Sequence, residues 1–178
     1  MNRMLLHVCC APCSTSVIER LKAETDYKLT LFFSNSNILP VVEYEKRKQT
    51  LIDFISKVHP EIEIIFDDYE PREFFDAIKG KESLGEGSTR CVSCIDFRLK
   101  KTANLAKEKG FDIFATTLTV SPHKNAKAIN EIGKRLEAEI GVAYFESDFK
   151  KRNGYLRSLE LCKEYGIYRQ SYCGCNLT

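Results

Sequence analysis

The sequence predicts an α/β fold in which one parallel sheet is covered by helices on both faces. Short β-rich runs alternate with amphipathic helical stretches along the whole chain, which is the pattern of such folds. The sequence contains no internal repeat, no low-complexity segment and no clear linker. Its 178 residues lie within the usual size of one domain, so we expect residues 1–178 to form a single α/β domain.

Five short runs rich in leucine, isoleucine and phenylalanine are predicted to form the strands. They are Met4–Cys9, Lys28–Ser34, Glu61–Phe66, Asp112–Thr119 and Val142–Glu146. The helices between them are predicted from apolar residues three or four positions apart and from Ser, Pro or Gly at their ends. They are expected at Ser14–Glu24, Val42–Val58, Pro71–Lys79, from Ser93 or Cys94 to Lys109, Asn125–Ile140 and Gly154–Tyr165. The Gly- and Ser-rich stretch Lys81–Thr89 is expected to be a mobile loop.

Composition and charge exclude several classes of protein. The net charge of +2 points to no particular partner, and no apolar run approaches the roughly 20 residues that span a bilayer. The N-terminal run shows no signal-peptide pattern, so we expect a cytoplasmic protein without a membrane partner. In that reducing compartment the eight cysteines are expected to bind metal or carry out redox chemistry rather than form structural disulfides.

The first cysteine cluster, Cys9-Cys10-Ala11-Pro12-Cys13, directly follows the first predicted strand. Adjacent side chains in a strand point in opposite directions, so these thiols converge only if the chain turns here, as Pro12 indicates. The N-terminus of the next helix would favour thiolates. Ligands of open parallel sheets bind beyond the carboxyl ends of the strands. We therefore predict a metal site at this edge.

The second cluster is the Cys91-x-x-Cys94 motif at the start of a predicted helix. Together the two motifs supply four or five thiols, which is enough for a four-thiolate site, and zinc would suit four sulfurs equally well. The position of the first cluster at the functional edge of a sheet favours an iron–sulfur cluster over structural zinc. Both motifs are therefore predicted to build one redox metal site.

The remaining cysteines are expected to have other roles. Cys173-Gly174-Cys175 encloses one residue, so a disulfide across it would be strained and easily reduced, as in a redox pair. Metal ligation and a tethered tail are the alternatives, and Gly174 is expected to supply the backbone freedom that such a ring needs. Cys162 lies on the apolar stripe of the last helix and is expected to pack in the core.

The three histidines and one basic run are weaker indicators of function than the cysteines. His7 inside the first strand is expected to be a hydrogen-bonded core residue, and His59 in a loop to be solvated. His123 follows the fourth strand and is a candidate for substrate contact or proton donation. Lys150-Lys151-Arg152, with Arg157 and Arg169, is either a solvated face or a nucleic-acid contact.

Four motifs together resemble the QueH-type epoxyqueuosine reductases. They are HVCCAPCS at 7–14, RCVSCIDFRL at 90–99, ATTLTVSPHKN at 115–125 and GYLRSLELCKEYGIYRQSYCGC at 154–175. The resemblance runs from residue 4 to the C-terminus. It implies reduction of epoxyqueuosine to queuosine in tRNA without cobalamin, and a Rossmann-related, nucleotide-α-hydrolase-like fold.

The resemblance also implies a set of site residues. It assigns a four-iron (4Fe–4S) cluster to Cys9, Cys10, Cys91 and Cys94 and a redox-active disulfide to Cys173–Cys175. Cys13 would then either ligate an additional iron or remain a nearby thiol. ATP-using relatives of such a fold carry a glycine-rich loop after the first strand, whereas CCAPCS contains no glycine, which argues against ATP.

The implied reaction is a deoxygenation that consumes two electrons and two protons and releases water. It needs an electron donor that the sequence does not identify and a proton donor, for which His123, Tyr172 and Ser121 are candidates. Two alternatives remain. One is a zinc-binding, RNA-binding module with structural thiols, and the other is a cluster-dependent tRNA sulfur transferase.

Overall fold

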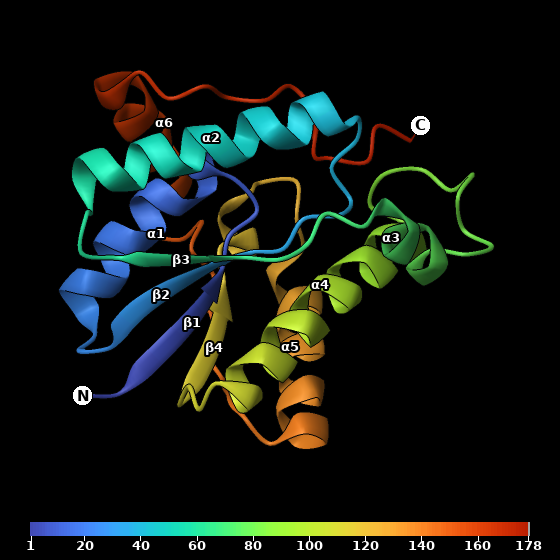
Figure 1. Cartoon of the computed structure of the whole chain (residues 1–178), viewed down its shortest axis with the longest axis horizontal. Helices are drawn as coiled ribbons and strands as arrows, with labels where there is room; N and C mark the ends of the chain where they lie inside the picture. Colours follow the sequence, from blue (N-terminus) through green and yellow to red (C-terminus); the bar gives the residue numbers. More distant parts are fainter. Residues whose placement is uncertain (178) are drawn as a thin grey trace.

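The computed structural model describes residues 1–177 and confirms the predicted α/β architecture, with one parallel sheet between two layers of helices (Figure 1). The five strands lie in the order β3-β2-β1-β4-β5, and every neighbouring pair is parallel. Their bounds are Arg3–His7 (β1), Lys28–Phe33 (β2), Glu63–Phe66 (β3), Ile113–Thr116 (β4) and Ala143–Tyr144 (β5). The carboxyl ends of β1 and β4 therefore lie side by side.

Helices cover both faces of the sheet because its central strand is apolar on both sides. The helices are α1 (Ala11–Glu24), α2 (Val41–Val58), α3 (Pro71–Ala77), α4 (Thr89–Glu108), α5 (Ala126–Ile140) and α6 (Gly154–Tyr165). Figure 1 shows α1, α2 and α6 on one side and α4 and α5 on the other. From β1, Met4 and Leu6 pack in the first layer and Leu5 in the second, as the alternation of a strand requires.

Several element boundaries differ from the sequence prediction, and three of these differences lie near the site. Helix α1 begins at Ala11 rather than Ser14, because the Cys10 thiol caps it by accepting from the Cys13 backbone N–H at 3.4 Å. Helix α4 begins at Thr89, within the stretch expected to be loop, because Ser88 caps its first turn. Strand β4 ends at Thr116, and a one-turn 3-10 helix, Leu118–Val120, follows it.

The interior confirms two of the predictions for single residues and corrects a third. His7 is buried with hydrogen bonds to Thr116 Oγ1 at 3.1 Å and Ser34 O at 3.3 Å, and burial lowers its pKa to about 4. Cys162 is buried in the core, as expected. The expectation that His59 is solvated is wrong. Its side chain is 14% exposed, because its ring packs edge-on against Phe54.

No helix within residues 1–177 combines the length and the apolar character that a membrane span requires.

Candidate functional site

Three cysteine sulfurs converge at the carboxyl end of β1. The Sγ atoms of Cys9, Cys10 and Cys13 all lie within 4.8 Å of one another, and those of Cys9 and Cys10 are 3.7 Å apart. The chain turns from strand to helix between Cys9 and Ala11, so the two adjacent side chains meet instead of pointing apart. Three sulfurs at this spacing can hold a metal ion.

Hydrogen bonds among these thiols favour a thiolate at Cys9. The side chains of Cys10 and Cys13 hold the pKa of Cys9 well below its usual value, and burial opposes this only in part. Thr117, just after β4, adds to the effect, because its Oγ1 lies 3.6 Å from Cys9 Sγ. The same oxygen accepts the Cys9 backbone N–H at 3.4 Å. A deprotonated thiol is the form that binds metals.

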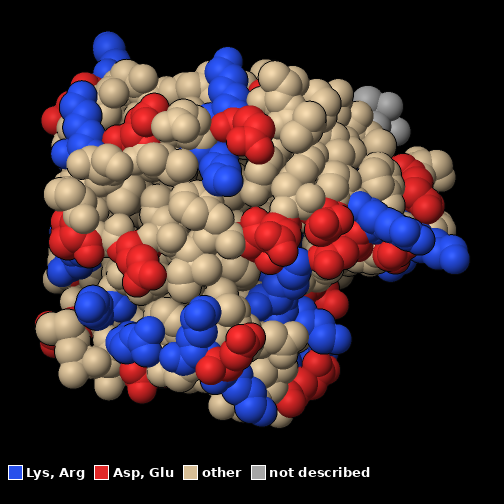
Figure 2. Space-filling model, in the orientation of Figure 1, with Lys and Arg blue, Asp and Glu red and all other residues tan. Residues whose placement is uncertain are grey.

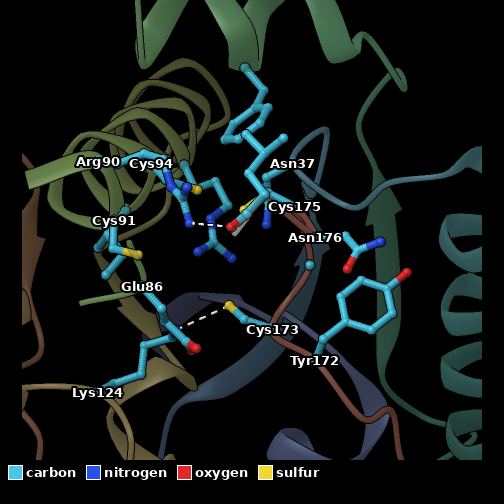
Figure 3. Close-up of a pocket in the computed structure, with 15 residues that line it drawn as sticks. Asn37, Glu86, Arg90, Cys91, Cys94, Lys124, Tyr172, Cys173, Cys175 and Asn176 are labelled. Atoms are coloured by element: carbon cyan, nitrogen blue, oxygen red, sulfur yellow. Dashed lines mark hydrogen bonds between the residues drawn. The ribbon is translucent and has the colours of Figure 1, made fainter. Parts of the chain in front are cut away.

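The other two cysteine pairs line a cavity of about 200 Å³. Figure 3 shows Cys91 and Cys94 entering it from α4 and Cys173 and Cys175 from the C-terminal segment opposite. The Gly87 backbone N–H donates to Cys91 Sγ at 3.3 Å, and burial raises the pKa of Cys94. All eight cysteines are free, so the expected Cys173–Cys175 disulfide is not formed.

A second cavity of about 370 Å³ adjoins the first and is lined by Cys9 and Cys13. Five residues line both cavities and form their common wall, namely Glu86, Arg98, Lys124, Tyr172 and Cys173. The structure therefore gathers Cys9, Cys10 and Cys13 and places Cys91 and Cys94 in the neighbouring cavity. Within residues 1–177 the gathered trio alone has metal-ligand spacing.

The C-terminal segment is held against the cavity mainly through its backbone carbonyls. Arg47 of α2 donates to the carbonyls of Tyr172 at 2.9 Å and Cys173 at 2.6 Å, and Leu39 N–H donates to that of Gly174 at 2.9 Å. A Cβ atom added at Gly174 would lie 2.7 Å from the side-chain nitrogen of Asn37. Gly174 has no positive φ, so close approach, and not the expected backbone freedom, explains the glycine.

All three candidate proton donors line the second cavity, and His123 is exposed there. The Tyr172 hydroxyl donates to the Leu39 carbonyl at 2.6 Å. Figure 3 shows its ring directed away from Cys173.

Most of the predicted nucleic-acid-binding cations are engaged within the chain. Lys150 donates to backbone carbonyls, while Arg152 and Arg157 form ion pairs with Glu24 and Glu19. On the face drawn in Figure 2, basic and acidic side chains are interspersed. Arg169 differs from these residues because it lines the second cavity.

The sequence prediction missed three polar residues of the site. Thr117 contacts Cys9, Lys124 donates to Cys173 Sγ at 3.1 Å, and Arg98 lies in the wall between the cavities. Only Arg98 had a signal in the sequence, because it follows Cys94 by four residues and therefore shares its helix face. The contacts of Thr117 and Lys124 join segments distant in sequence, and no local pattern shows them.

Comparison with known proteins shows similarity to one family over almost the whole chain. The family model described as "Epoxyqueuosine reductase QueH" matches residues 4–178. The chain is 47% identical over 176 residues to epoxyqueuosine reductase QueH of Streptococcus pyogenes serotype M1, covering 97% of this chain and 68% of that protein. It is 44% identical to the Staphylococcus aureus (strain Mu50) protein of that name, covering 97% and 74%. For the Thermotoga maritima protein the identity is 42%, covering 98% and 89%.

Proposed function

The chain belongs to the epoxyqueuosine reductase QueH family, and from that premise we propose that it reduces epoxyqueuosine to queuosine in tRNA. We propose that Cys9, Cys10, Cys91 and Cys94 would hold a four-iron cluster, which would supply the electrons for this reduction without cobalamin. The observation that carries the proposal is the convergence of three thiols at the carboxyl edge of the sheet, beside a cavity that α4 lines with two more.

The residues present fit a thiolate-bound centre. Cys9, Cys10 and Cys13 are close enough to share one metal, and the lowered pKa of Cys9 favours the charged form that binds it. Soft thiolate ligands suit iron–sulfur clusters and zinc alike. Cys13 is proposed as a ligand of an additional iron. A bound iron–sulfur centre supplies electrons one at a time, and an iron with an open position acts as a Lewis acid.

The overall reaction balances with two electrons and two protons. Both carbon–oxygen bonds of the epoxide break, a carbon–carbon double bond forms, and the oxygen leaves as water. An external low-potential electron donor supplies the electrons. We propose that His123, exposed in the second cavity, gives a proton to the departing oxygen, ahead of Tyr172, whose hydroxyl is bonded to a backbone carbonyl.

The fold supports the proposed relationship to nucleotide-binding proteins. The strand order 3-2-1-4-5 is that of the Rossmann-related folds, and the proposed site lies beyond the carboxyl ends of β1 and β4, where these folds bind ligands. We propose a nucleotide-α-hydrolase-like fold for the chain and assign residues 1–178 to one cytoplasmic domain. The two cavities open at the same edge, so the modified nucleoside of the tRNA would enter there.

The test is turnover by the full chain, reconstituted anaerobically with iron and sulfide. With dithionite and no cobalamin it should convert epoxyqueuosine in tRNA to queuosine, detected by mass spectrometry of nucleosides. Cys9→Ser should abolish conversion, whereas Cys162→Ala, which removes a buried thiol that lines neither cavity, should retain it. A wild-type protein with an intact cluster but without turnover would refute the proposal. A colourless zinc protein would instead indicate the RNA-binding module.

A further inference from the structure

Arg98 is a buried cation that pairs with no carboxylate among residues 1–177. The residue is 2% exposed, its Nε has no hydrogen-bond partner, and within residues 1–177 no ion pair joins it to Asp or Glu. The guanidinium keeps its proton, and a buried charge without a counter-ion is costly. The position of Arg98 therefore requires an anion nearby.

Thiols are the groups that surround Arg98. Arg98 lines the first cavity together with Cys94 and Cys173 and the second together with Cys9. These three cysteines come from α4, the C-terminal segment and the loop after β1. Arg98 lines both cavities and so lies between the two groups of thiols.

Lys124 adds a second cation to the same wall. Its Nζ donates to Cys173 Sγ at 3.1 Å, as the dashed line in Figure 3 shows. Other buried arginines nearby are used differently. Arg47 pairs with Glu43, and Arg90 donates to backbone carbonyls.

We propose that Arg98 and Lys124 are positioning residues whose positive charges lie beside the thiols of the two cavities and thereby raise the midpoint potential of the metal centre. The inference rests on the proposed function. Reduction adds one electron from an external donor and no proton, so the reduced centre is more negative and nearby cations stabilise it. Arg98 is almost fully buried in the wall between two cavities that cysteines line, which favours this role over binding a substrate phosphate.

The first measurement is the midpoint potential of the anaerobically reconstituted full chain, titrated with dithionite and redox dyes. Arg98→Gln and Lys124→Gln should each shift the potential to more negative values, while Arg98→Lys stays near wild type. Lys101→Gln is the matched control. Lys101 also lies on α4, and its charge is already paired with Asp67 and Glu73. Equal iron and sulfide contents must show that the variants hold the same centre.

The second measurement does not depend on iron. Metal-free protein is titrated with Co²⁺ and followed by thiolate-to-cobalt absorption. Arg98→Gln should bind Co²⁺ about tenfold more weakly than wild type, as expected for the loss of one charge-assisted interaction. Arg98→Lys should retain most of the affinity. If wild type binds no iron or sulfide, the proposed function fails, and this titration still decides the role of Arg98.

The outcomes separate the two proposals. If the midpoint potential and the Co²⁺ affinity keep their wild-type values in both glutamine variants, the inference is wrong and the proposed function still stands. If Arg98→Gln does not fold, Lys124→Gln and Arg98→Lys give the answer. An unchanged potential with a raised KM for tRNA in Arg98→Gln would show that the arginine serves a substrate phosphate, and the inference would be wrong.

Discussion

Replacing Arg47 by methionine is expected to release the C-terminal segment that carries Cys173. Arg47 is 2% exposed, and its Nη atoms donate to the carbonyls of Cys173 and Tyr172 at 2.6 and 2.9 Å. Its Nε donates to Glu43 at 2.8 Å. Methionine has a similar length and an apolar stem, so it preserves much of the packing and removes the three hydrogen bonds.

The magnitude follows from the contacts that are lost. A hydrogen bond to a charged donor contributes about 1.5–3 kcal/mol, so the two carbonyl contacts together stabilise docking by about 3–6 kcal/mol. Two effects place the net loss of docking free energy near the lower limit. The carbonyls of a released segment bond to water, and Glu43 still accepts a hydrogen bond from the Tyr168 hydroxyl at 3.0 Å. A loss of about 3 kcal/mol raises the population of the undocked segment by about a hundredfold.

Amide hydrogen exchange at Leu39 measures this docking directly, because its N–H donates to the Gly174 carbonyl of the segment at 2.9 Å. In Arg47→Met its protection should fall by about a hundredfold. The protection of the Leu39 amide in Arg47→Lys should lie between that of wild type and that of Arg47→Met, since an ammonium group cannot make the two parallel hydrogen bonds of a guanidinium. Lys57→Met on the same helix is the control for lost charge. Unchanged protection at Leu39 in Arg47→Met, in a folded variant, would refute the reasoning.

Three further predictions concern stability and docking. Arg157→Ala should cost about 0.5–1 kcal/mol at neutral pH, because it breaks an exposed bidentate pair with Glu19. Arg157 lowers the pKa of Glu19 below 4.5, so this contribution is present above that value and lost as pH falls through the lowered pKa. The urea midpoints of wild type and variant should converge in acid, and a constant difference would contradict this. Gly174→Ala should accelerate exchange of the Leu39 amide, because its Cβ would crowd a side-chain nitrogen at 2.7 Å, whereas Gly85→Ala, with open space around it, should not. Gly133→Ala should lower the free energy of unfolding by about 1–3 kcal/mol, because its Cβ would clash with the aromatic ring of β5, and an unaltered urea midpoint would count against that packing.

The order of helices and strands could be predicted from the sequence because it depends on local patterns. The period of apolar residues showed the layers, and Gly141 and Gly166 marked helix ends that the structure confirms. The first residues of the helices were harder to predict than their ends. Helix α1 begins at a cysteine cap rather than a serine, because a thiol can also accept the first free N–H groups of a helix.

Parts of the site could be predicted for the same local reason. Cys9, Cys10 and Cys13 are close in sequence, and the strand-to-helix turn brings their sulfurs together. Cys91 and Cys94 were predicted to share one site with Cys9 and Cys10. The structure places them in the adjoining cavity, and their joint ligation stays a proposal.

The sequence by itself determined the parallel α/β fold, the clustering of the cysteines and the family, because these depend on residue order and spacing. The tertiary structure alone decided that Cys173 lies against Lys124, that Thr117 contacts Cys9, and that Arg98 separates the two groups of thiols. Each of these relationships joins segments far apart along the chain, and only the packing of the helices on the sheet sets their distances. The charge that surrounds the thiols is therefore a property of the fold.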